Sequence, residues 1–120
     1  MAVLSTVLIA LVAAEHLYFL VLEMFLWQQP TGLKAFNQSP EKAAMSAPLA
    51  ANQGLYNGFL AAALIAGFFI PDANAGFTLQ GYTLICVVVA GLYGGMSVSP
   101  RIWALQALPG ALALAALLYR

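Results

Sequence analysis

Four long apolar stretches, separated by three short polar breaks, make up nearly all of the chain. A helix needs about 20 apolar residues to cross the roughly 30 Å hydrocarbon layer of a bilayer, and each stretch meets or approaches that length. Strands of a membrane barrel would instead alternate apolar and polar residues over about ten positions, which this chain does not do. The pattern predicts an all-α integral membrane bundle of four transmembrane helices, forming a single domain 1–120, with spans at about 2–28, 48–70, 79–96 and 102–119.

The breaks at 29–47, 71–76 and 97–100 contain the proline and glycine residues expected where helices end. Lys34, Lys42 and Arg101 lie in the first and third breaks, which share one side of the membrane, whereas the other side has Arg120. Because cytoplasmic loops carry an excess of Lys and Arg, this distribution favours both termini outside. We therefore expect a multi-pass protein of the cytoplasmic (inner) membrane.

Composition excludes the soluble classes of protein. Of the 120 residues, 63% are hydrophobic and 7% are charged, whereas the surface of a soluble domain is usually about 25–35% charged. The formal net charge is zero and no basic run is present, so the chain lacks the clustered Lys and Arg that nucleic acid requires. Cys86 is the only cysteine, which excludes an intrachain disulfide and a site with several thiolate ligands.

Three ionisable residues interrupt the first apolar stretch: Glu15, His16 and Glu23. An ionised group at the centre of a membrane helix costs at least about 2.5–3.5 kcal/mol, so these side chains must face protein or water. At about 100° per residue, His16 and Glu23 lie about 20° apart on the helix wheel, and Glu15 points about 100° away from His16. The helix thus presents two polar directions, as expected for a helix packed between two neighbours.

The second stretch combines polar residues with a ridge of small ones. Four polar side chains occupy an arc of about 140° on the helix, namely Asn52, Gln53, Tyr56 and Asn57. Small residues recur beside them at every fourth position, at Ala50, Gly54, Gly58, Ala62 and Ala66. This spacing allows two helix backbones to approach closely in lipid, and it predicts close packing of the second helix.

Adjacent spans run antiparallel, so the depths of their polar residues can be compared. A similar depth on the cytoplasmic half is expected for five side chains, those of Glu23, Asn52, Gln53, Tyr93 and Gln106. We expect a polar cleft that opens toward the first and third breaks and reaches down to Glu15 and His16. Pro109 removes a backbone hydrogen bond and should kink the fourth helix, leaving a carbonyl near Leu105 in need of a partner.

The sequence contains few residues that could bind a metal ion or a cofactor. Glu15, His16 and Glu23 supply one imidazole and two carboxylates, but Glu23 lies about 10 Å along the helix axis from His16. One chain therefore cannot close a metal site, although an oligomer could, and we expect no metal and no cofactor. Phosphate-binding, serine-hydrolase and zinc-hydrolase motifs do not occur. The amide side chains have an alternative role as hydrogen-bonding links between helices, which applies to Asn52, Gln53, Asn57 and Gln106.

Several long motifs resemble one known family. They read EHLY at 15–18, LEMFLW at 22–27 and NQGLYNGFLA at 52–61, and they are accompanied by Phe36, AGLYG at 90–94, Gln106 and Pro109. In these features the chain is similar to the small bacterial membrane proteins grouped as domain of unknown function family 1304. The resemblance extends over almost the whole chain. It implies four membrane helices in one short chain of the bacterial inner membrane, and no settled biochemical activity.

Three hypotheses follow for the function. The first is a protein that binds and transports a small molecule or ion, with Glu15, His16 and Glu23 exchanging protons, since His titrates near neutral pH. Four helices enclose little volume, so such a protein is expected to be a homo-oligomer surrounded by membrane lipid. The second is a membrane-embedded enzyme that transfers protons on a lipid-like substrate. The third is a structural or accessory membrane subunit in which the polar groups only specify packing.

Overall fold

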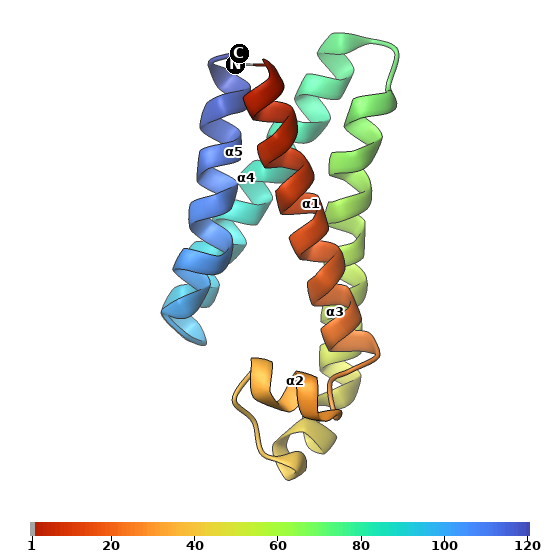
Figure 1. Ribbon diagram of the computed structural model, residues 1–120, viewed down its shortest axis with the longest axis vertical. Coiled ribbons are helices and arrows are strands. Elements are labelled where there is room, and N and C mark those ends of the chain that lie inside the picture. Colours follow the sequence, from red (N-terminus) through yellow and green to blue (C-terminus); the bar gives the residue numbers. More distant parts are fainter. Residues whose placement is uncertain (1) are drawn as a thin grey trace. The chain divides into compact units, whose positions relative to one another are not determined.

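The computed structural model describes residues 2–120, and it is all-α, with no strand in that range. The helices follow one another in the order α1 (Ala2–Met24), α2 (Pro30–Ala35), α3 (Pro40–Phe69), α4 (Ala73–Ser97), the π-helical segment η1 (Trp103–Ala107) and α5 (Leu108–Leu118) (Figure 1). The chain divides into two compact units. We call Ala14–Ala61 the hairpin unit, and the described residues up to Ala13 together with Ala62–Arg120 the α4–α5 unit.

Two helices, α1 and α4, are long and apolar enough to cross a membrane by length and composition. Only 28% of the apolar window of α1 and 33% of that of α4 is buried within the structure. The core helix of a soluble protein would be mostly buried. In α1 and α4, by contrast, most of the apolar window lies outside the buried interior. Helix α3 has 30 residues but carries Asn52, Gln53 and Asn57 in its middle, and the apolar helix Trp103–Leu118 is shorter.

The helix boundaries differ from the sequence prediction mainly around the first break. Helix α1 ends at Met24 rather than near residue 28, and α3 begins at Pro40 rather than at residue 48. Ser39 explains the early start, because its Oγ accepts a hydrogen bond from the Lys42 amide at 3.2 Å and Pro40 follows at the position that proline favours. The preceding helix α2 ends where Asn37 adopts a left-handed φ of 51°, a conformation that terminates helices.

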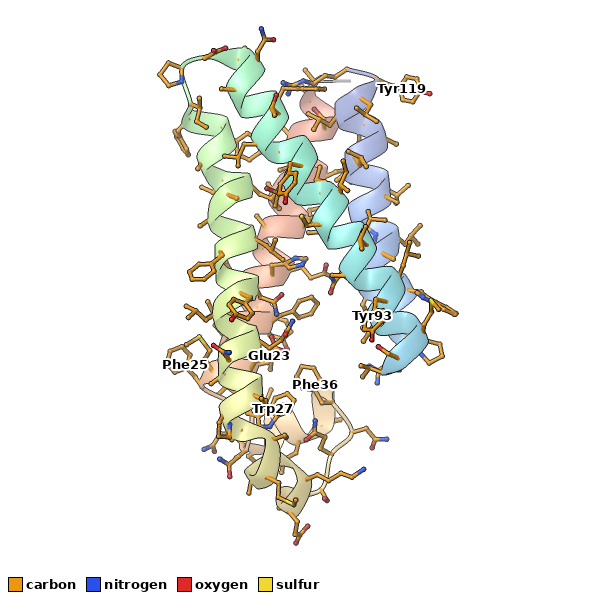
Figure 2. All side chains as sticks on the ribbon, turned by 180° about the vertical axis from the view of Figure 1, so that it is seen from behind. Glu23, Phe25, Trp27, Phe36, Tyr93 and Tyr119 are labelled. Carbon is orange, nitrogen blue, oxygen red and sulfur yellow. The ribbon has the colours of Figure 1, made fainter. Side chains whose placement is uncertain are left out.

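The hairpin unit consists of the end of α1, the short helix α2 and most of α3, with α2 in the connection between the two longer helices (Figure 1). Gly32 of α2 lies directly against the backbone of Leu26, and a Cβ at this position would overlap the Leu26 carbonyl oxygen. Trp27 donates its Nε1 hydrogen to Ser46 Oγ of α3 at 3.1 Å, and its ring lies 4.8 Å from that of Phe36 (Figure 2). These contacts fix the connection against α3.

The α4–α5 unit has a core of apolar and small side chains. The buried residues of this core are Ile9, Val12, Ala13, Leu64, Leu84, Val87, Ala107, Ala113, Ala116 and Leu117. At Gly91 the backbone of α4 comes so close to that of η1 that an added Cβ would lie 2.6 Å from the Ala107 nitrogen. Asp72 precedes α4, and its carboxylate accepts a hydrogen bond from the Asn74 amide at 2.9 Å and so caps the N-terminus of the helix.

The segment η1 is a widened turn that ends two residues before Pro109. The Leu108 amide bonds to the Trp103 carbonyl five residues earlier, as in a π-helix. Proline lacks an amide hydrogen and its ring crowds the carbonyl four residues earlier, which here is that of Leu105. A π-helical turn provides one extra residue at this point. We expect a kink at Pro109 from the sequence, and the structure has a π-helical turn just before this residue.

Candidate functional site

The side chains of Glu23 and Asn57 meet across α1 and α3 in the hairpin unit. Asn57 Nδ2 donates a hydrogen bond to Glu23 Oε1 at 2.5 Å. Asn57 is 7% exposed and Glu23 is half-buried, and Figure 2 shows Glu23 beside α3. A carboxylate on an apolar helix is thus joined to an uncharged amide on the neighbouring helix.

Small residues on α3 make this meeting possible. A Cβ added at Gly54 would lie 2.7 Å from Met24 Cγ and 3.1 Å from Glu23 Cβ, and one at Gly58 would lie 2.6 Å from Leu20 Cδ1. A larger residue at Gly54 would press against Glu23 Cβ and against the Leu20 carbonyl oxygen, 3.3 Å away, and so push α1 from α3. At Gly58, by contrast, the end of the Leu20 side chain can turn aside. The ridge of small residues therefore positions the polar pair, in addition to packing the helices.

Glu15 and His16 lie two turns earlier on α1. His16 is fully buried, and its ring lies 5.4 Å from that of Phe19 in an edge-to-face arrangement. Glu15 is half-buried, and its Oε1 is a buried atom that accepts no hydrogen bond from residues 2–120. A buried carboxylate oxygen without a donor is costly, and it has the capacity to accept a hydrogen bond from a ligand or to hold a proton.

The other three residues of α3 that were predicted to line the polar cleft lie away from Glu23. Asn52, Gln53 and Tyr56 are all exposed, and Tyr56 has a relative exposure of 51%. Asn52 and Tyr56 each lie about 160° from Gly54 around the helix, so they are nearly opposite the face that contacts α1. The structure therefore brings Asn57, but not Asn52 or Tyr56, to the carboxylate.

Tyr93 and Gln106 belong to the α4–α5 unit. Tyr93 lies near one end of α4 (Figure 2) and is 71% exposed. Gln106 Nε2 donates to the Val87 carbonyl at 3.1 Å and so joins η1 to α4. Of the two roles considered for Gln106, this contact corresponds to hydrogen bonding between helices.

Two further polar residues of the α4–α5 unit make contacts that the sequence analysis did not anticipate. Gln80 is 2% exposed, and its Nε2 donates to the Leu64 carbonyl of α3 at 3.0 Å. Trp103 Nε1 donates to the Leu92 carbonyl of α4 at 3.1 Å. A signal for Gln80 was present, because it lies four residues after Gly76 and four before Leu84, on a face whose members are buried. Both contacts join helices through a backbone carbonyl.

Within residues 2–120, no three His, Cys, Asp or Glu side chains are grouped closely enough to hold a metal ion. The polar chemistry of the hairpin unit is therefore that of a carboxylate, an amide and an imidazole. Such a set can bind protons, cations and hydrogen-bond donors.

The fold and this site define a small all-α protein with apolar helices and carboxylates within one of them. The chain belongs to the family described as protein of unknown function (DUF1304), whose family model matches residues 10–118. It is also 32% identical over 120 residues to the uncharacterized protein YpaA of Lactococcus lactis subsp. lactis (strain IL1403), covering 98% of this chain and 97% of that protein. No solved structure matches the chain. These findings confirm the family resemblance of the sequence motifs.

Proposed function

We propose that this chain is a four-span protein of the bacterial inner membrane that binds and transports a small cation, which exchanges with a proton at Glu23. The spans are α1, α3 from about residue 48, α4, and the combined helix Trp103–Leu118. The protein acts as a homo-oligomer within membrane lipid, with both termini outside.

The membrane location is supported by the large apolar side chains that α1 and α4 expose. They include Val3, Leu4, Val7, Leu11, Leu17 and Val21 on α1 and Phe77, Ile85, Val89, Leu92 and Met96 on α4. Water would strongly disfavour such continuous apolar surfaces, whereas the hydrocarbon layer of a bilayer solvates them. The low charge content, 7% of residues, supports the same location.

The single observation that carries the proposed activity is the hydrogen bond from Asn57 to Glu23. An uncharged amide satisfies one acceptor position of the carboxyl group whether that group is neutral or ionised. A Lys or Arg partner would instead hold the carboxylate permanently ionised. The second oxygen of Glu23 therefore remains able to take either a proton or a cation, which is the requirement for exchanging one for the other.

Glu15 provides a second acceptor in the same helix. Its buried Oε1 lies eight residues from Glu23, or about 12 Å along the axis. A cation that leaves Glu23 would meet this carboxyl group further along α1. We assign His16, between the two carboxylates in sequence, the role of exchanging protons with them.

The proposal is tested with proteoliposomes that enclose the pH-sensitive dye pyranine. Four cations are added outside in separate experiments: ethidium, tetraphenylphosphonium, Na⁺ and K⁺. Exchange of an entering cation for a leaving proton makes the interior alkaline, and we expect this response with at least one of them. Glu23→Gln keeps the hydrogen bond from Asn57 but cannot release a proton, so it should abolish the response.

The matched control is Glu41→Gln, because Glu41 is an exposed carboxylate in the first turn of α3. This variant undergoes the same chemical change away from the site and should retain the wild-type response. Equal traces for the wild type and Glu23→Gln, including no response from either, contradict the proposed exchange.

The α4–α5 unit favours a second candidate function, that of a structural or accessory subunit. There Gln80, Gln106 and Trp103 all donate to backbone carbonyls of neighbouring helices, contacts that hold helices together and need no ligand. Under this alternative, Glu23→Gln would leave cation responses unchanged, and the chain would co-purify from membranes with a larger complex.

A further inference from the structure

One face of α3 repeats with a period of seven residues and is exposed along its length. We call Met45, Leu49, Asn52, Tyr56 and Phe59 the outer face of α3. Their successive spacings are four, three, four and three, which is the spacing of the a and d positions of a coiled coil. All five are exposed, Leu49 at 75% and Phe59 at 58%.

The outer face lies opposite the contact with α1. Leu49, Asn52, Tyr56 and Phe59 each lie about 140–160° from Gly54 around the helix, and Gly54 is the residue that approaches Glu23 and Met24. Within the hairpin unit, α3 therefore uses one face for α1 and leaves the other without a covering helix. The Tyr56 and Phe59 rings lie 6.1 Å apart on this face, and exposed aromatic groups of this kind are enriched at protein interfaces.

Lipid is an unsuitable neighbour for this face. With the span beginning near residue 48, Asn52 lies about 6 Å and Tyr56 about 12 Å inside the membrane. An amide in hydrocarbon has no water to bond with, so an exposed Asn52 requires a partner that is both donor and acceptor. Apolar lipid chains offer neither.

A second copy of the same helix provides such a partner. Two copies inserted in the same direction are related by a two-fold axis along the membrane normal, so identical residues of the two α3 helices meet. An amide is both donor and acceptor, and Asn52 can therefore pair with its counterpart in the other copy. A single amide residue among aliphatic and aromatic a and d positions also fixes the register and the number of helices.

We propose that the outer face of α3 is the interface of a homodimer, in which two α3 helices pack as a parallel left-handed pair with the two Asn52 side chains hydrogen-bonded to each other. This inference rests on the membrane-spanning part of the proposed function and is independent of cation exchange. It places the Glu23–Asn57 pair of each copy behind the dimer contact, on the other side of α3.

The test uses disulfide cross-linking in native membranes. Cys86 is first changed to Ala so that the chain has no other cysteine, and Asn52→Cys is then introduced and oxidised with copper phenanthroline. The matched control is Leu55→Cys, which lies at nearly the same depth but about 80° from the centre of the outer face. We expect a dimer band for Asn52→Cys and a monomer band for Leu55→Cys.

A second measurement avoids cysteine substitution. Energy transfer between donor-labelled and acceptor-labelled wild-type chains is followed as they are diluted with lipid in vesicles. Asn52→Leu removes the interhelical hydrogen bonds and should weaken dimerisation by about tenfold, whereas Asn52→Gln retains an amide and should restore part of it. Resistance to carbonate extraction verifies that each variant is still inserted in the membrane.

The proposal is overturned if Asn52→Cys remains monomeric on oxidation, if Leu55→Cys cross-links equally well, or if Asn52→Leu dimerises as the wild type does. If the protein is inserted in the membrane but does not dimerise, only the interface is contradicted. Cation exchange is still decided by the pyranine responses of the wild type and Glu23→Gln. Conversely, a dimer with no cation response upholds the interface and contradicts cation exchange.

Discussion

In the α4–α5 unit, Gln80, Gln106 and Trp103 donate their side-chain hydrogens to backbone carbonyls, whereas in the hairpin unit Asn57 donates to the carboxylate of Glu23. A backbone carbonyl accepts a hydrogen bond at any pH and does not exchange protons. A carboxyl group does exchange them. Both units use glycine to bring helices together, but only the hairpin pair joins that packing to a group that can change its charge.

This comparison separates amide side chains that bond to a backbone carbonyl from one that bonds to an ionisable group. The amide of Asn57 resembles that of Gln106 in type and in its place between two helices, and the two differ in what accepts their hydrogen bond. Residue type alone is therefore a poor guide to what an amide side chain between two helices contacts. Substitutions that affect one unit and spare the other can test the distinction.

The largest effect on stability is expected from Gly91→Ala in the α4–α5 unit. The new Cβ would lie 2.6 Å from the nitrogen and 2.9 Å from the Cα of Ala107. Backbone atoms cannot turn aside as a flexible side chain can, so the backbones of α4 and η1 must separate, at a cost of about 3 kcal/mol, the upper end of the usual range for overpacking. The control is Gly81→Ala, where the nearest atom, Leu117 Cδ2, is 3.9 Å away.

Alanine favours a helix over glycine by about 1 kcal/mol, so the control should raise the Tm where Gly91→Ala lowers it. Circular dichroism in detergent micelles measures both. Equal shifts of the same sign would show that α4 and η1 do not pack this closely.

The next effect is expected from Asn57→Ala in the hairpin unit. It leaves the half-buried Glu23 carboxyl group without its donor, which costs about 1–3 kcal/mol. A double-mutant cycle with Glu23→Ala should give a coupling free energy of about 0.5–3 kcal/mol between the two residues. Titration with sodium dodecyl sulfate provides the free energies of unfolding. Additive losses would mean that the hydrogen bond contributes nothing to the contact between α1 and α3.

A smaller loss of stability is expected from Gln106→Leu. The Val87 carbonyl loses the hydrogen bond from Gln106 but can still accept the backbone hydrogen bond of its own helix, α4. Interhelical hydrogen bonds in membrane proteins contribute about 0.6 kcal/mol on average and reach about 1.7 kcal/mol. The same titration should therefore show Gln106→Leu to be less destabilised than Asn57→Ala. The reverse order would contradict the distinction drawn between the two units.

The sequence predicted the helical class and several details of packing, since hydrophobic length and small residues at every fourth position carry that information directly. Gly54 and Gly58 of the predicted ridge both lie at close approaches to α1. The helix in the first break was not predicted: α2 and the start of α3 are formed by local capping through Ser39 and Asn37 and by contact of Gly32 with Leu26. A segment rich in polar residues gives no periodic signal for such contacts.

The sequence predicted which residues belong to the candidate site, but not which of them contact one another. Asn52 and Asn57 are the same residue type five positions apart, and helix geometry alone places them about 140° from each other. Which of them meets Glu23 depends on which face of α3 packs against α1, and several faces carried small or polar residues. The spacing of Gln80 from Gly76 and Leu84 indicates its place on the buried face of α4, but nothing near it in the sequence indicates its partner, the Leu64 carbonyl.

The smallest effect that still discriminates is expected from Ser46→Ala in the hairpin unit. Ser46 Oγ accepts a hydrogen bond from Trp27 Nε1 and donates one to the Lys42 carbonyl four residues earlier. Ser97 in α4 provides a matched control, since its Oγ donates in the same way to the Tyr93 carbonyl. The two substitutions remove the same local bond, and Ser46→Ala removes in addition the contact with Trp27.

The difference between the two variants therefore measures the tertiary hydrogen bond, for which we expect about 0.5 kcal/mol, the low end of the usual range, because this bond is only part-buried. In a Trp103→Phe background, Trp27 is the only tryptophan, and its fluorescence reports unfolding of the hairpin unit alone. Ser46→Ala should lower the midpoint of that transition and Ser97→Ala should leave it unchanged. Equal midpoints would mean that Trp27 is held by its contact with Phe36, because the ring packing persists in both variants.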